Sequence, residues 1–68
     1  MDKEYLFNEI QRFMIKVKKD FQDNIITKVQ YELMHIELSH LIESICNTEL
    51  LISITKFDAI KTTYIIMK

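Results

Sequence analysis

Residues 26–45 read ITKVQYELMHIELSHLIESI, and this stretch decides the fold class of the 68-residue chain. Thr27 and Gln30 have the spacing of a capping box, in which each side chain accepts a hydrogen bond from the other residue's backbone N–H. Apolar residues follow at helical spacing. The sequence therefore predicts a helix that starts near Lys28.

This predicted helix is apolar on two faces. One stripe comprises Val29, Leu33 and Ile36, and the other comprises Tyr31, Met34, Leu38, Leu41, Ile42 and Ile45. A helix that is apolar most of the way round is normally buried between neighbours. We therefore expect it to be the central element of the fold.

The segment before it, from Lys3 to about Phe21, is amphipathic. Its apolar stripe comprises Leu6, Ile10, Phe13, Met14, Val17 and Phe21, and its charged face comprises Glu9, Arg12, Lys16, Lys19, Asp20 and Asp23. Apolar residues at three- and four-residue steps are typical of a helix with one face on a core. Asp23 and Asn24 favour a turn and mark its end.

The last segment offers two possible helix starts. Asn47 suits a left-handed residue after the central helix, and Thr48 could cap a short helix from Glu49 to Ile54. The stretch Thr55-Lys56-Phe57-Asp58 then resembles a second N-cap, which would open a helix to Lys68. Many β-branched residues lower the helix propensity here, so an extended C-terminus is the alternative.

Composition supports an all-α fold. Glycine and proline are both absent, whereas strand-rich folds need glycine in their turns. We expect one domain, residues 1–68, folded as a small three- to four-helix bundle. A chain this short buries only about 60% of the surface that its unfolded form exposes, yet 49% of its residues are apolar. We therefore expect a homodimer, with these interface candidates: Leu6, Ile10, Phe13, Val17, Leu38, Leu41 and Ile45.

The near-neutral net charge and the lack of a signal-peptide pattern favour a cytoplasmic protein. The formal net charge is −1, so no overall field draws the chain to nucleic acid or to an anionic membrane. The first residues, Met1 to Glu4, are mixed in charge and lack the pattern of a signal peptide. Cys46 is the single cysteine, which rules out a disulfide within one chain and suggests a small buried or half-buried side chain. We expect no membrane association.

Two Glu-x-x-His spacings, Glu32/His35 and Glu37/His40, bear on metal binding. Di-iron bundles use this pair, but they draw the pairs from different helices. The two histidines lie roughly 140° apart around one helix, so they cannot share a metal within one chain. We expect no metal, no cofactor and, without a recognisable catalytic motif, no enzymatic activity.

Basic and hydroxyl side chains in the last segment are candidates for DNA contact. They are Lys56, Lys61, Thr62, Thr63 and Lys68. Such side chains contact phosphates and base edges, although acids offset the bases overall and an ordinary solvated face is the alternative. Arg12, Lys16 and Lys19, with Lys18 nearby, form a second basic group on the first helix.

The order of predicted elements is that of a helix-turn-helix, with residues 50–54 as the supporting helix, Thr55-Lys56 as the turn and Phe57–Lys68 as the recognition helix. With the central helix entering through residues 26–33, the chain resembles the front half of the staphylococcal accessory regulator branch of the MarR-type winged-helix repressors.

That resemblance implies a homodimer held by the terminal helices, with the recognition helix in the major groove and the five candidates above facing DNA. The family continues into a β-hairpin wing beyond the position of Lys68. A relative without the wing is expected to bind DNA weakly, or to pair with a full-length regulator and disable it.

Two hypotheses follow from the sequence. The first is a helix-turn-helix-like transcription regulator, or an antagonist of one. The alternative is a phage- or plasmid-type inhibitor or adaptor that docks an amphipathic helix face on a host protein, as such helices do through anchors at i, i+3, i+4 and i+7.

Overall fold

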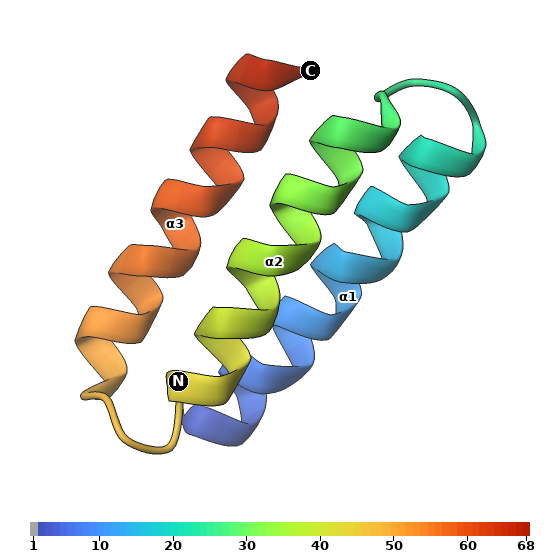
Figure 1. Cartoon of the computed structure of the whole chain (residues 1–68). Coiled ribbons are helices and arrows are strands. Elements are labelled where there is room, and N and C mark those ends of the chain that lie inside the picture. The colour runs from blue at the N-terminus through green and yellow to red at the C-terminus, as the bar shows by residue number, and fades with distance from the viewer. Residues whose placement is uncertain (1) are drawn as a thin grey trace.

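A computed structural model describes residues 2–68, which form three helices: α1 (Lys3–Gln22), α2 (Lys28–Ser44) and α3 (Leu50–Met67). The helices run up, down and up, so α1 and α3 point the same way with α2 antiparallel to both (Figure 1). The bundle measures 34 × 18 × 17 Å. The prediction of a small all-helical bundle is confirmed, with no strand in the described residues.

The connection between α1 and α2 forms where the sequence predicts a turn. Asn24 has a φ of 61°, in the left-handed region that asparagine tolerates better than most residues. The backbone N–H of Ile25 donates to the carbonyl of Asp20 at 2.8 Å, and that of Asn24 donates to Phe21 at 3.1 Å. This pair of bonds is the Schellman motif, which satisfies carbonyls at the end of α1.

The predicted capping box at the start of α2 is confirmed. The Thr27 N–H donates to Gln30 Oε1 at 2.8 Å, and the Gln30 N–H donates to Thr27 Oγ1 at 3.2 Å. The side-chain amide of Gln30 also donates, through Nε2, to the backbone carbonyl of Met67 at 3.3 Å. The start of α2 is thereby tied to the end of α3.

The predicted break in the last segment is wrong, because α3 is one continuous helix. The Thr55 hydroxyl does not cap a helix but donates back to the carbonyl of Leu51 at 2.9 Å. Ser53, Phe57 and Tyr64 are all buried, so one unbroken face contacts the core along the whole helix. Tertiary packing of that face outweighs the lower propensity of the β-branched residues. The helix-turn-helix arrangement predicted around Thr55-Lys56 is therefore absent.

The connection before α3 also differs from the prediction. Asn47 is not in the left-handed region, since Asn24 is the residue with positive φ in the described part of the chain. Glu49, rather than Thr48, occupies the N-cap of α3, and its side chain makes no capping hydrogen bond.

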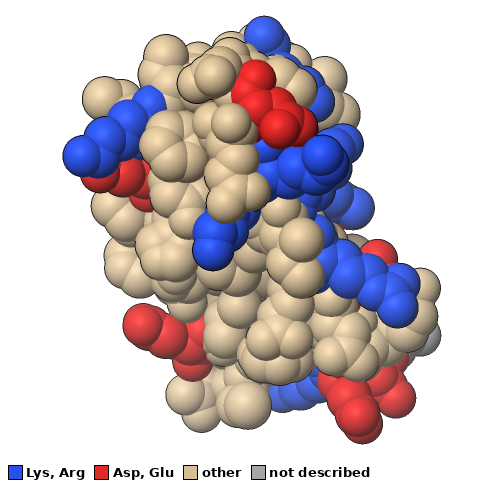
Figure 2. Space-filling model, turned by 90° about the vertical axis from the view of Figure 1, so that its right-hand side faces the viewer, with Lys and Arg blue, Asp and Glu red and all other residues tan. Residues whose placement is uncertain are grey.

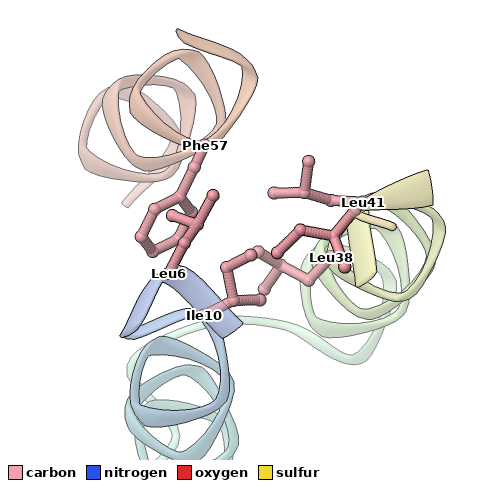
Figure 3. Close-up of a cluster of buried hydrophobic side chains, with 6 residues drawn as sticks. Leu6, Ile10, Leu38, Leu41 and Phe57 are labelled. Carbon is pink, nitrogen blue, oxygen red and sulfur yellow. The ribbon is translucent and has the colours of Figure 1, made fainter. Parts of the chain in front are cut away.

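The core consists of two clusters stacked along the bundle. The first comprises Leu6, Ile10, Leu38, Leu41, Ile45 and Phe57, whose labelled members point toward one another from all three helices (Figure 3). The second comprises Val17, Ile26, Met34 and Tyr64. Because α2 packs closely along both α1 and α3, it is the central element that the sequence predicts.

Large aromatic side chains fill the wider space between α1 and α3. The Phe13 ring meets the Phe57 and Tyr64 rings edge-to-face, with centroids 5.8 Å and 5.4 Å apart. Such geometry adds to the apolar burial itself. Phe13 therefore joins α1 to α3 where their backbones are not in close contact.

Asp20 lies inside the bundle, which corrects its predicted place on the charged face of α1. Its carboxylate accepts a hydrogen bond from the buried Tyr64 hydroxyl and another from Lys68 Nζ at 3.2 Å. Burial raises the pKa of Tyr64 well above its ordinary value of 10.0, and the hydrogen bond to Asp20 and the negative charge of Asp20 raise it further.

Candidate interaction surfaces

The second apolar stripe of α2 faces away from the core. Val29, Leu33 and Ile36 are 65%, 51% and 51% exposed, and we call this set the α2 stripe. The other stripe of the same helix, through Met34 and Leu38, is buried. Steps of four and three residues place the α2 stripe along one side of the helix. An apolar ridge is thus left on the outside of the bundle.

Acidic side chains flank the α2 stripe. They are Glu32, Glu37 and Glu43, and all three are exposed. The basic residue within α2 is Lys28, at its first position. The ridge therefore has an apolar crest and predominantly negative borders.

The outward face of α3 is also uncharged. Five exposed residues follow one another at steps of three and four, and we call them the α3 seam: Ile52, Thr55, Ala59, Thr62 and Ile66. Leu51 and Ile65 lie along one border of the seam and are 72% and 73% exposed. The outward face of α1, by contrast, carries most of that helix's lysines and its arginine. The outward face of α3 thus exposes apolar side chains that no neighbouring helix of the described residues covers.

A shallow groove of about 490 Å³ separates the two apolar faces. Glu37 and His40 of α2 line one wall, and Lys56 and Ala59 of α3 line the other. The groove therefore brings an acid, an imidazole and a base together beside the α3 seam.

The interface candidates predicted from the sequence do not lie on the α2 stripe or the α3 seam. Six of them are buried within the chain, namely Leu6, Ile10, Val17, Leu38, Leu41 and Ile45. Phe13 is partly buried between α1 and α3. These side chains form the core because the strongest stripes of α1 and α2 pack on each other. The six buried candidates are therefore not accessible on the surface of the folded bundle.

The α3 seam is a feature that the sequence-based prediction missed. Its signal was present, since residues 52, 55, 59, 62 and 66 repeat at alternating steps of three and four without a charge. The predicted break at Thr55-Lys56 divided this pattern between two helices and hid it.

The five DNA-contact candidates do not form one surface. Lys61 pairs with Asp58 at 3.3 Å and lies over the Phe57 ring, 4.5 Å from its centroid. Lys68 is tied to Asp20 on the side facing α1, whereas Lys56 lines the groove beside α2. Thr62 and Thr63 are exposed on α3. The Thr63 hydroxyl donates to the carbonyl of Ala59 at 2.9 Å.

Basic side chains are spread over the middle and upper part of the surface seen in Figure 2, with acidic side chains among them. Arg12 pairs with Glu9 at 3.2 Å, and Lys19 pairs with Asp23 at 3.3 Å. Arg12 and Lys16 line a groove of about 310 Å³ between α1 and α3, opposite Lys61. Arg12 and Lys19 are thus each paired with an acid three or four residues away in the sequence.

The remaining reactive side chains lie apart from one another. Cys46 is exposed, which corrects the expectation of a buried or half-buried thiol. Over residues 2–68, no three histidine, cysteine or acidic side chains approach closely enough to hold a metal ion. Across the same residues, no helix combines the length and apolarity required to cross a membrane.

Compared with protein-family models, curated proteins and solved structures, the chain matches none of them. The resemblance to the staphylococcal accessory regulator branch thus rests on the predicted order of elements, and the break at Thr55-Lys56 in that order is absent from α3.

Proposed function

We propose that this chain is a small, non-enzymatic regulatory protein that acts by binding another protein through the α2 stripe. The observation that carries the proposal is the exposure of Val29, Leu33 and Ile36 on a helix whose other apolar stripe already fills the core. Contiguous exposed apolar patches mark interaction sites. Anchors at such spacing fit an apolar groove on a partner.

The borders of the α2 stripe suggest the chemistry of that partner. Because Glu32, Glu37 and Glu43 flank the apolar crest, the complementary surface is an apolar groove with lysine or arginine along its rim. Rim charges of this kind accelerate association and select partners more than they add affinity. A host regulator or enzyme with such a groove would be inhibited by occupation of the groove.

Capture experiments with matched variants test this proposal. Tagged wild-type protein, a Leu33→Asp/Ile36→Asp variant and an Ile15→Asp control would be incubated with lysate of the source cells. Ile15 is 68% exposed on α1, so the control places a charge on a different apolar surface. We expect one protein to be captured by wild type and control and lost by the α2 variant. Recovery of the bait alone, or equal capture by all three, would contradict the proposal.

DNA association is the second candidate function, and the exposed basic residues of α1 are the observation that favours it. Arg12 and Lys16 line the groove between α1 and α3, and Lys18 and Lys19 are also exposed on α1. A mobility-shift series would show retardation that weakens as salt rises, because phosphate contacts release counterions. Lys16→Glu should abolish the shift. Binding that ignores salt, or no binding at low salt, would exclude this function.

A further inference from the structure

The α3 seam has the same order of side chains in both directions. From Ala59 toward the start of α3 the seam meets Thr55 and then Ile52, and toward the end it meets Thr62 and then Ile66. In an isologous contact, residue i of one copy meets residue j of the other, and j meets i. We infer that two copies of the chain dimerise by antiparallel packing of α3 on α3, with the two-fold axis beside Ala59.

The seam's side chains suit such a contact. Alternating steps of three and four residues form the a and d positions of a seam between two helices. In the antiparallel dimer, Ile52 of one copy meets Ile66 of the second copy, and Thr55 meets Thr62. The small side chain of Ala59 lies at the axis and permits a close approach, within the range of about 8–10 Å found for packed helices.

The borders of the seam decide the direction of packing. Antiparallel helices bring Leu51 of one copy next to Ile65 of the other, so two of the most exposed apolar side chains cover each other. Parallel helices would instead place Leu51 beside Lys56, and Asp58 beside Thr63. Apolar contacts on both the seam and its border therefore favour the antiparallel arrangement.

The charges near the axis are compatible with this packing. Asp58 lies on the border that carries Leu51 and Ile65, and its carboxylate is paired with Lys61 of the same chain at 3.3 Å. This pairing reduces repulsion between the two copies of Asp58. Lys56 lies on the opposite border, beside the groove that also contains Glu37.

The dimer extends the proposed function. It rests on that function in one respect, because both require that the chain acts by association. The α2 stripe and the α3 seam lie on different helices, so dimerisation leaves both α2 stripes exposed. A dimer would then present two copies of the partner-binding surface, which raises avidity for a partner that is itself an oligomer. Substitutions can disrupt either surface without affecting the other, because different residues form them.

Light scattering on the whole chain tests dimerisation. At micromolar concentration, wild type and the Ile15→Asp control should have twice the chain mass of 8.2 kDa. Ile66→Asp should give a folded monomer, since Ile66 is 81% exposed and its replacement leaves the core intact. Circular dichroism would confirm the helix content of each variant. A wild-type monomer would overturn the inference, and so would an Ile66→Asp variant that still dimerises.

Cysteine cross-linking tests the direction. In a Cys46→Ser background, Ala59→Cys should form a disulfide between copies, because the two-fold axis brings the two positions within the Cα separation of about 7 Å that a disulfide allows. Ile52→Cys alone should not cross-link, since antiparallel packing holds its two copies about 20 Å apart. A mixture of Ile52→Cys and Ile66→Cys should cross-link. Self-linking of Ile52→Cys would show parallel packing and refute the antiparallel dimer.

The experiments distinguish failure of the α3 dimer from failure of the α2 contact. Loss of the dimer in Ile66→Asp with retained capture of the same protein would support the α3 contact and leave the α2 contact in place. Capture that depends on Leu33 and Ile36 from a wild-type monomer would overturn the dimer alone.

Discussion

The hydroxyl of Tyr64 donates a hydrogen bond to the buried carboxylate of Asp20, which joins the last turn of α3 to the last turn of α1. Lys68 completes the cluster, with its Nζ 3.2 Å from the same carboxylate oxygen and 5.5 Å from the Tyr64 ring centroid. A buried charge is costly unless it is paired and hydrogen-bonded. The three side chains therefore fix the end of α3, and with it the position of the α3 seam.

Replacing Tyr64 with phenylalanine should destabilise the bundle by about 1–3 kcal/mol, because Asp20 would lose a donor while staying buried. Urea denaturation at neutral pH measures this change. Tyr5→Phe is the control, since Tyr5 is exposed and should tolerate the change. Equal stability of Tyr64→Phe and wild type would show that the Asp20 carboxylate is satisfied without the phenol.

Stability should fall in acid because of Asp20. The hydrogen bond from Tyr64, opposed by burial and supported by Lys68, holds the pKa of Asp20 below its ordinary value of 3.8. The unfolded chain thus binds the proton more readily, so this contribution is complete above the unfolded pKa and is lost as the pH falls through the folded pKa. Urea titrations between about pH 6 and about pH 2 should show wild type and Asp20→Asn converging. A difference that stays constant over this range would contradict the prediction.

Ser53 is fully buried, and its hydroxyl has no hydrogen-bond partner among the described residues. Ser53→Ala should therefore raise the free energy of unfolding by about 1 kcal/mol, because it removes an unpaired polar group and improves helix propensity. Thermal and urea denaturation both report the change. Ser44→Ala is the matched control, since the Ser44 hydroxyl donates to Leu41 at 3.1 Å and should not give the same gain. Destabilisation by Ser53→Ala would indicate that this hydroxyl has a partner.

The two sides of α2 should respond differently to truncation. Leu38→Ala should cost about 2–5 kcal/mol, because Leu38 is 1% exposed in the core and its loss leaves a cavity. Leu33→Ala should change stability by about 0.5 kcal/mol or less, as exposed substitutions usually do. Denaturation of both variants in dilute solution gives the comparison. Similar losses for the two would show that the α2 stripe is already covered in the protein studied.

Local signals in the sequence predicted much of the fold. The Asp23-Asn24 turn gives the end of α1, and the Thr27–Gln30 capping box gives the start of α2. Both were predictable because their hydrogen bonds join residues within a few positions of one another. The absence of glycine and proline predicted the all-helical class for a similar reason, since turn geometry depends on the residues in the turn. These features need no knowledge of distant parts of the chain.

The features that define the candidate surfaces depend on contacts between distant residues. Thr55 suits an N-cap locally, yet packing of Phe57 and Tyr64 on α1 keeps α3 continuous through it. Asp20 fits the charged side of α1 by spacing, but Tyr64, 44 positions away, draws it into the bundle.

The sequence by itself determined α1, α2 and the apolar faces of these two helices. Tertiary structure decided which faces stay exposed. Both stripes of α2 are apolar enough to be buried, but two neighbouring helices cover one side of a third and no more. Met34, Leu38 and Leu41 occupy that side, so Val29, Leu33 and Ile36 face outward. The same limit leaves the α3 seam uncovered, because a bundle of three helices gives each helix two neighbours and one open side.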